Sequence, residues 1–160
     1  MGLSKKSSLF YFGFFIVGLT IIIYGAFLIY KAKISEKWPK IKGEITKLEI
    51  IKKTKKKSVS YRPSIEYKYL VNNSNYVGNR ISFWDLSSSD KSEIENSLRT
   101  FDTKKAVEVY YNPSSPSDSV LLPGTNWGVW QPFFGGFIVW LIALVVFFYE
   151  FLAKRFGWQK

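Results

Sequence analysis

The chain has 160 residues, of which 47% are hydrophobic and 19% aromatic, and it carries a formal net charge of +11. It contains no Cys and no His, which excludes disulfide scaffolds, Cys or Cys/His zinc sites, thiol enzymes and His-based catalysts. The length suits one domain, but apolar and charged residues are segregated: two uncharged apolar runs flank 96 residues that carry 18 Lys and Arg and 11 Asp and Glu.

The first apolar run, residues 9–30, predicts a transmembrane helix after a short basic tail, residues 1–8, that contains Lys5 and Lys6. Its 22 residues span about 33 Å at about 1.5 Å per residue, enough for a hydrocarbon core of about 30 Å. Such a segment must bond its own backbone in lipid, which favours a helix. The run is too long for a typical signal peptide and no small-x-small site closes it, so we expect an uncleaved signal anchor.

The middle of the chain, residues 31–126, predicts a soluble domain rich in strands. Residues 43–51 indicate a strand, although Ile45, Leu48 and Ile50 alternate with polar residues only imperfectly. Residues 65–71 follow period two, residues 72–75 are a turn cluster, and residues 76–83 can return as the partner strand. Gly78 within that return strand predicts a β-bulge.

One short helix and two more strands complete the predicted domain. Asp90 and Glu93 have the spacing of a capping box, and the apolar residues that follow predict a short amphipathic helix. Residues 106–111 predict a strand, residues 112–116 a turn imposed by prolines, and residues 119–122 a last short strand. The predicted fold class is an α+β membrane protein, in which two transmembrane helices flank a small β-rich, barrel-like domain of about five strands and one short helix.

The second apolar run, residues 127–149, predicts the other transmembrane helix, followed by a basic tail in residues 150–160. Trp127, Trp130 and Tyr149 stand at its ends, as side chains of an interfacial belt do. Small residues recur seven apart in both runs, which places each pair on one helix face and favours close helix packing. These residues are Gly18, Gly25, Gly136 and Ala143.

The two spans place both termini on one side of the membrane and the middle on the other, and the flanking charges disagree about the sides. Five lysines directly after the first helix favour the middle on the inside, whereas Lys154, Arg155 and Lys160 favour the termini inside. Long loops translocate largely regardless of charge, so the second helix counts for more. We expect a two-span protein of the cell (inner or plasma) membrane, with both termini cytoplasmic and the β-rich domain extracytoplasmic.

Several short patterns in the middle follow one another in the order seen in a known family. They are Trp38-Pro39, Gly43-x-Ile45, Tyr61-x-Pro63-x-Ile65-x-Tyr67-x-Tyr69, Gly78-x-x-Ile81, and Val107-x-Val109-Tyr110-Tyr111-Asn112-Pro113-x-x-Pro116-x-x-Ser119-Val120-Leu121 with Pro123-Gly124. Over Trp38 to Gly124 the chain resembles a bacterial membrane family catalogued as domain of unknown function 3592. The Tyr-Tyr-Asn-Pro-x-x-Pro block is the most specific part. The resemblance implies a β-rich domain between two membrane anchors, and it supplies no activity and no catalytic residues.

A lysine cluster between the first two predicted strands is the most concentrated charge feature, and it has two interpretations. As a functional site, it would contact anionic lipid head groups or another polyanion, at about 1 kcal/mol per Lys near a charged surface. As an ordinary loop, it would be a solvated hairpin tip, because like charges repel and prefer water. Nucleic-acid binding would also need exposed aromatics, whereas Tyr61, Tyr67, Tyr69 and Tyr76 are expected to form a buried strand face. The cluster consists of Lys52, Lys53, Lys55, Lys56 and Lys57.

No arrangement of residues in the sequence indicates an enzyme. Without His there is no Ser-His pair, and no phosphate loop, metal-binding helix or acidic calcium loop occurs. We therefore expect no catalytic residue, no cofactor and no metal site.

The leading hypothesis is a membrane-anchored, non-enzymatic interaction module held close to the bilayer. Its expected partners are the lipid bilayer and an unidentified membrane or envelope protein, but not nucleic acid, and the sequence leaves the oligomeric state open. One alternative is an accessory subunit that packs on a larger membrane complex through its helices. A third is a hydrolase that uses a Ser/Lys pair.

Overall fold

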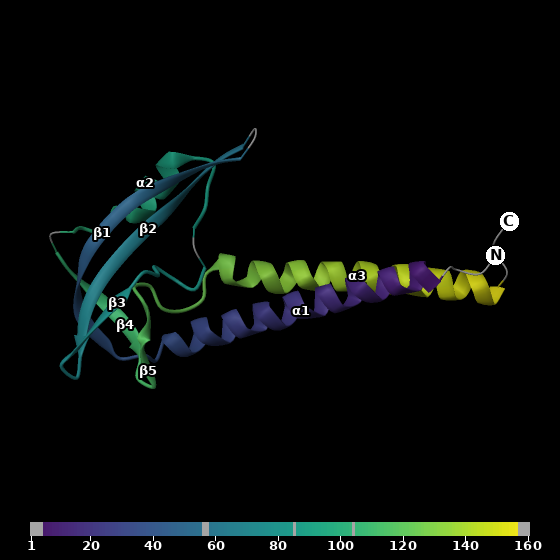
Figure 1. The fold of residues 1–160 in the computed structure, drawn as a ribbon, viewed down its shortest axis with the longest axis horizontal. Coiled ribbons are helices and arrows are strands. Elements are labelled where there is room, and N and C mark those ends of the chain that lie inside the picture. The colour runs from purple at the N-terminus through teal and green to yellow at the C-terminus, as the bar shows by residue number, and fades with distance from the viewer. Residues whose placement is uncertain (1–4, 56–57, 85, 104, 157–160) are drawn as a thin grey trace. The chain divides into compact units, whose positions relative to one another are not determined.

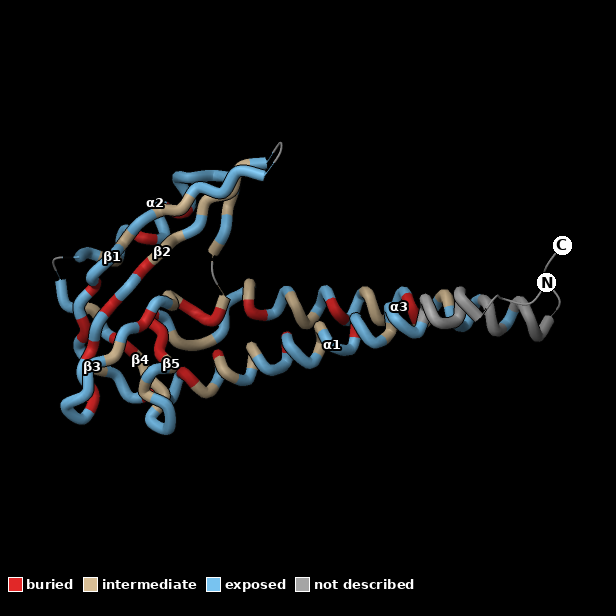
Figure 2. Tube along the Cα trace, viewed as in Figure 1, coloured by how far each residue is buried: buried red, intermediate tan, exposed pale blue. Residues whose placement is uncertain are grey.

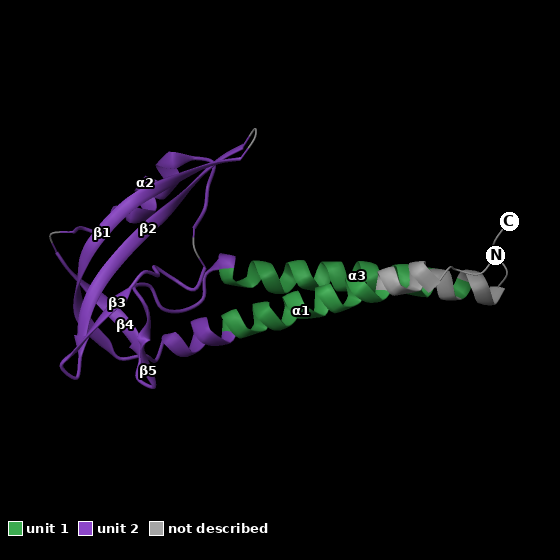
Figure 3. Ribbon diagram, viewed as in Figure 1, with its two compact units in different colours: residues 1–29, 129–160 green, residues 30–128 purple. Residues whose placement is uncertain are grey.

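The computed structural model describes residues 5–55, 58–84, 86–103 and 105–156, and these residues form three helices and five strands. The chain divides into two compact units, one of residues 1–29 and 129–160 and the other of residues 30–128 (Figure 3). In chain order the elements are α1 (Lys5–Ser35), β1 (Lys40–Lys55), β2 (Ser58–Val71), β3 (Ser74–Gly78), α2 (Lys91–Leu98), β4 (Ala106–Asn112), β5 (Ser115–Val120) and α3 (Trp127–Phe156) (Figure 1).

Helices α1 and α3 supply two candidate membrane spans. Residues Phe12–Ser35 and Trp127–Tyr149 are each long and apolar enough to cross a membrane, judged by length and composition. Most of the large side chains described along them are exposed (Figure 2). Helix α1 continues to Ser35 instead of ending near Tyr30, because residues 31–35 contain no helix breaker before Pro39.

The second unit is built on one five-stranded antiparallel sheet in the order β3-β2-β1-β4-β5. Strands β1 and β2 form a long hairpin, and Asn72 and Asn73 make the tight turn from β2 to β3. Their φ values are 49° and 61°, in the left-handed region that Asn tolerates better than most residues. The turn predicted at residues 72–75 is therefore confirmed for Asn72 and Asn73, whereas Ser74 and Asn75 already belong to β3.

A β-bulge in β1 explains why the apolar residues of this strand alternate imperfectly. The pairing with β2 shifts between Ile45 and Lys47, which leaves Thr46 as an extra residue. Ile45 and Leu48 are three residues apart, yet their partners on β2 are only two apart, so both side chains lie on the same face.

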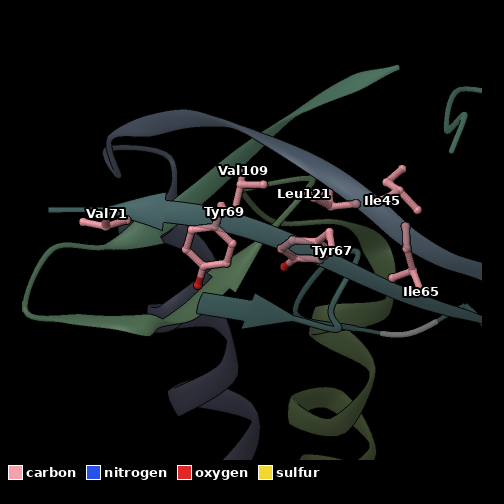
Figure 4. Packing of buried hydrophobic residues seen from close by; sticks show 7 residues of the cluster. All are labelled: Ile45, Ile65, Tyr67, Tyr69, Val71, Val109 and Leu121. Carbon is pink, nitrogen blue, oxygen red and sulfur yellow. The ribbon is translucent and has the colours of Figure 1, made fainter. Parts of the chain in front are cut away.

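The core lies on one face of the sheet, and alternate residues of β2 contribute most of it. Its buried members are Ile45, Ile65, Tyr67, Tyr69, Val71, Val109 and Leu121 (Figure 4). The predicted buried tyrosine face is confirmed for Tyr67 and Tyr69, which are 0% and 3% exposed, while Tyr61 and Tyr76 are half-buried. The alternation of side chains along residues 65–71 therefore predicts the buried face of this strand correctly.

Gly78 has a packing role in this core. It is the cross-strand partner of Tyr67, and a Cβ at Gly78 would lie 2.2 Å from Tyr67 Cε2 and 2.6 Å from Ser119 Oγ. The β2–β3 register continues without a shift to Val71 and Ser74, so the bulge predicted at Gly78 is wrong. A strand glycine also marks places where another group approaches closely, and here that group is a tyrosine ring.

The sheet is open, which corrects the barrel-like form predicted from the sequence. Its order ends at β3 and β5, and no ladder joins these two edge strands among the described residues. Just beyond the strand ends, the Leu121 N–H donates to Ile81 O at 3.1 Å and the Leu122 N–H to the same oxygen at 2.7 Å. These bonds hold the two edges near each other without closing the ladder, because β5 ends at Val120.

Strand β5 begins at Ser115 instead of the predicted Ser119, and it includes Pro116. The turn before it therefore needs only residues 113–114, rather than 112–116. Proline removes a ladder donor, which is tolerated because β5 is an edge strand.

Helix α2 begins where predicted, after Asp90. The Asp90 carboxylate accepts the N–H of Ser92 at 2.8 Å, which satisfies one donor of the first helical turn. The reciprocal half of the capping box is replaced, because Ser88 Oγ accepts the Asp90 N–H at 3.0 Å and donates to Glu93 at 2.6 Å.

Candidate functional site

The β1–β2 hairpin extends well past its neighbours in the sheet. Strand β4 pairs with β1 only over Lys40–Glu44, and β3 pairs with β2 only over Tyr67–Val71. Residues 49–55 of β1 and 58–64 of β2 therefore form a two-stranded projection, which we call the lysine arm (Figure 1).

The lysine arm is a concentrated positive charge. Residues 50–65 contain five Lys and one Arg and no Asp or Glu. Lys52, Lys53 and Lys55 are exposed on β1, whereas Lys56 and Lys57 lie outside the described residues. The nearest acidic residue along β1, Glu49, already pairs with Lys47 at 3.2 Å.

The lysines of the arm do not share one face. Lys52 lies opposite Tyr61, while Lys53 and Lys55 lie opposite Ser60 and Ser58. Successive side chains of a strand point to opposite faces, so Lys52 is on one face and the other two are on the reverse face. A flat surface pressed against one face of the ribbon would meet only some of the charges.

One edge of the arm is covered and held in place. The Tyr61 N–H donates to Ser88 O at 2.7 Å and the Ser88 N–H donates back to Tyr61 O at 3.0 Å, which adds a short bridge beside β2. Helix α2 packs on β2, with Ile94 and Leu98 buried. The β1 edge of the arm has no such bridge within the described parts of the chain.

Gly18 and Gly25, two of the four small residues predicted to pack the helices, lie directly against the backbone of α3. A Cβ at Gly18 would lie 2.9 Å from the backbone N of Trp140, and one at Gly25 would lie 2.5 Å from that of Phe133. Contacts of this kind allow no larger side chain, because a backbone atom cannot rotate away. The antiparallel helices therefore meet backbone to backbone at these two glycines.

Gly136 and Ala143, the two small residues of α3, are also closely packed. A Cβ at Gly136 would lie 2.8 Å from the backbone N of Ile22, and Ala143 is only 7% exposed. By contrast, Gly13 and Gly135 have open space around the same hypothetical atom. The spacing of seven keeps the small residues on one seam, as in a heptad packing of helices.

A charge cluster that no sequence pattern indicated lies around Asp118 of β5. Its carboxylate accepts from Lys31 Nζ at 2.6 Å and also pairs with the Arg80 guanidinium. Burial alone would raise the pKa of Asp118, but the hydrogen bond from Lys31 and the charge of Arg80 outweigh it and lower the pKa. The partners are 87 and 38 residues away in sequence, so no local spacing could have revealed them.

The buried tyrosines form a polar network inside the core. The Tyr67 hydroxyl donates to Arg80 O and lies 3.1 Å from Ser119 Oγ, and the Tyr69 hydroxyl donates to Pro116 O. Burial raises the pKa of Tyr67 to about 12. The Tyr67 hydroxyl thus stays protonated at neutral pH and holds Arg80 and Ser119 together inside the core.

Among the described residues, no three His, Cys, Asp or Glu side chains lie together as ligands for a metal ion. Two carboxylates of the domain pair with lysines instead. Glu108 pairs with Lys40 at 2.8 Å, and the hydrogen bond from that lysine lowers the pKa of Glu108. Glu95 pairs with Lys91 at 2.6 Å.

The lysine arm, the turn before β5 and all five strands except the first two residues of β1 fall inside a family match. The family model described as Domain of unknown function (DUF3592) matches residues 42–126, which is more than half of the chain. The chain belongs to this family. The resemblance drawn from the short patterns is thereby confirmed, although the matched range leaves out Trp38 and Pro39. No curated protein matches the chain.

The DUF3592 patterns in this chain build the domain core and its turns. Tyr67 and Tyr69 face the core, Gly78 makes room for the Tyr67 ring, and the prolines of the last block lie in and beside the edge strand β5. The Asn112 side chain accepts the Ser114 N–H at 3.0 Å, which stabilises the turn between β4 and β5. These short patterns thus explain parts of the fold of this chain.

Proposed function

We propose that the protein is a membrane-anchored, non-enzymatic interaction module whose lysine arm binds an anionic surface. The observation that carries this proposal is the projection of the arm beyond the sheet, with exposed lysines and no acidic residue over residues 50–65. A solvated hairpin tip would need only a short turn, whereas this ribbon continues for seven residue pairs past the bulk of the sheet, from Glu49–Ser64 to Lys55–Ser58.

Membrane anchoring is supported by the surfaces of α1 and α3. Phe12 is 62% exposed, Ile23 61% and Ile142 57%. Exposing such large apolar side chains is costly in water and favourable in hydrocarbon. Tyr30, 63% exposed, closes the uncharged run of α1, and Trp127, 76% exposed, begins α3; amphipathic rings at such places suit the head-group region.

The charge of the arm sets the expected strength of binding. At about 1 kcal/mol per Lys near an anionic surface, the two lysines that share one face, Lys53 and Lys55, give an advantage of about 2 kcal/mol, or roughly 30-fold in affinity. The Debye length falls from about 10 Å at 0.1 M salt to about 3 Å at 1 M, so this advantage is lost in high salt.

The experiment compares binding of the full chain, carried in neutral nanodiscs, to vesicles that contain phosphatidylglycerol. Replacing the five arm lysines with Ser should abolish salt-sensitive binding. A matched control removes the same charge elsewhere and should bind nearly as the parent does. If both variants lose binding equally, net charge explains the attraction and the arm is not the site. The control positions are Lys33, Lys37, Lys42, Lys68 and Lys105.

We further propose that both termini are cytoplasmic and that the domain lies outside the cell membrane, in agreement with the basic residues after α3. The chain has no native Cys, so single cysteines report cleanly on sidedness. A Lys55→Cys variant should react with an impermeant maleimide in intact cells, and a Ser4→Cys variant should react only after lysis. The reverse pattern would establish the opposite orientation.

An accessory role in a larger membrane complex, through the helix glycines, is less well supported. Gly18, Gly25 and Gly136 already contact the opposite helix of the same chain. A partner subunit would have to use the bulky outward side chains instead, and these are equally suited to lipid.

A further inference from the structure

The β1 edge of the hairpin is an open strand edge of unusual length. Strand β4 covers β1 only as far as Glu44, and from Thr46 to Lys55 no strand or bridge adds to that edge in the described chain. Ten residues at about 3.3 Å each give about 33 Å of edge, longer than a typical strand of about 20 Å. Alternate residues along it present backbone N–H and C=O groups that β2 does not use.

Proteins usually protect such edges, because unpaired backbone groups recruit other strands. Here the bulge at Thr46 and the lysines are the protective features. They act most strongly against a second copy of the same chain. Residues 46–55 carry four Lys and one Glu, a net charge of +3 per strand, so two such edges side by side would repel.

The same charges favour an occupant of opposite sign. We propose that the free edge of β1 binds an extended acidic segment of a partner protein, which adds as an antiparallel strand. Backbone hydrogen bonds would supply affinity, and carboxylates opposite Lys52, Lys53 and Lys55 would supply selectivity. Because these lysines lie on both faces of the ribbon, a strand at the edge reaches all three, whereas a flat surface does not.

Ile50 and Ile51 indicate a second feature of the sequence expected in the partner strand. They precede the lysines on β1 and are half-buried, one on each face. The partner strand is therefore expected to carry acidic residues opposite the lysines, followed by two apolar residues opposite the isoleucines. This inference rests on the free backbone edge, so it stands or falls separately from vesicle binding, which depends on charge alone.

The test uses the full chain in non-ionic detergent and a fluorescent ten-residue peptide, Glu-Thr-Glu-Glu-Val-Val-Lys-Val-Glu-Thr, complementary to residues 55 down to 46. A second peptide has the same side chains but N-methylated amides, which removes its backbone donors and keeps its charge. Fluorescence anisotropy should show at least tenfold weaker binding of the N-methylated peptide. Replacing Lys52, Lys53 and Lys55 with Glu should abolish binding of both.

Hydrogen exchange supplies the second measurement. The peptide should slow exchange of about half of the amides in residues 46–55, namely those that do not bond to β2. Equal affinity of the two peptides, or binding without this protection, would refute the proposal and leave only charge attraction. Protection of the same amides in the protein alone, rising with concentration, would assign the edge to a second copy and would also refute it.

Discussion

Gly135 and Gly136 are neighbours on α3, yet the structure predicts different effects on stability when each is replaced by Ala. A Cβ at Gly136 would lie 2.8 Å from Ile22 N and 2.9 Å from Ile21 Cβ, whereas a Cβ at Gly135 meets nothing within 4 Å. The pair therefore tests helix packing with a control one residue away.

The magnitudes follow from two terms. Replacing Gly with Ala inside a helix gains about 1 kcal/mol of helix propensity, and this gain applies to both positions. Adding a methyl to a filled interface costs about 1–3 kcal/mol, and this cost applies only to Gly136. Gly135→Ala should therefore be stabilising by up to about 1 kcal/mol, and Gly136→Ala should be less stable than Gly135→Ala by about 1–3 kcal/mol.

The assay is equilibrium unfolding by sodium dodecyl sulfate in mixed micelles, followed by near-ultraviolet circular dichroism. Trp140 is a suitable reporter, because its ring lies 5.6 Å from that of Phe15 and its backbone lies beside Gly18. Equal midpoints for Gly135→Ala and Gly136→Ala would refute close packing at this seam. Gly25→Ala should be more damaging than Gly136→Ala, because its Cβ would approach the Phe133 backbone to 2.5 Å.

Two further predictions concern the β-rich domain, and both are measured by thermal unfolding of the full chain in detergent. Gly78→Ala should destabilise by about 1–3 kcal/mol, because the new Cβ would lie 2.2 Å from Tyr67 Cε2, whereas the exposed Asn75→Ala on the same strand should change little. Asp118→Asn should cost about 1–3 kcal/mol at neutral pH, since both cationic partners lose a charged acceptor. The pKa of Asp118 is lowered from 3.8, so its contribution is present above that value and is lost as the pH falls through the lowered pKa. The variant should accordingly show a flatter loss of stability between about pH 5 and pH 2, and an unchanged slope would contradict the pairing.

Local patterns predicted much of the fold because each rests on a short-range physical rule. Period two along residues 65–71 identified the core face of β2, and Asp90 identified the start of α2. The strand over residues 106–111 is β4 to within one residue. The lysine cluster was evident from composition, but its division between two faces required the register of the hairpin.

The wrong predictions concern residues whose structural role depends on a neighbour that is distant in the sequence. Gly78 was interpreted as a bulge because a strand glycine has two explanations, and only the position of the Tyr67 ring distinguishes them. Pro116 was placed in a turn because the sequence does not tell an edge strand from a central one.

By itself, the sequence determined two long apolar helices, a β-rich segment between them and membership of a family, because composition and periodicity act within a few residues of the chain. Only the tertiary structure decided that the sheet stays open, that Asp118 meets Lys31 and Arg80, and that β1 leaves a long edge unpaired. These features depend on where strands end relative to one another and on contacts across dozens of residues. Such contacts form only when the sheet and its core assemble together.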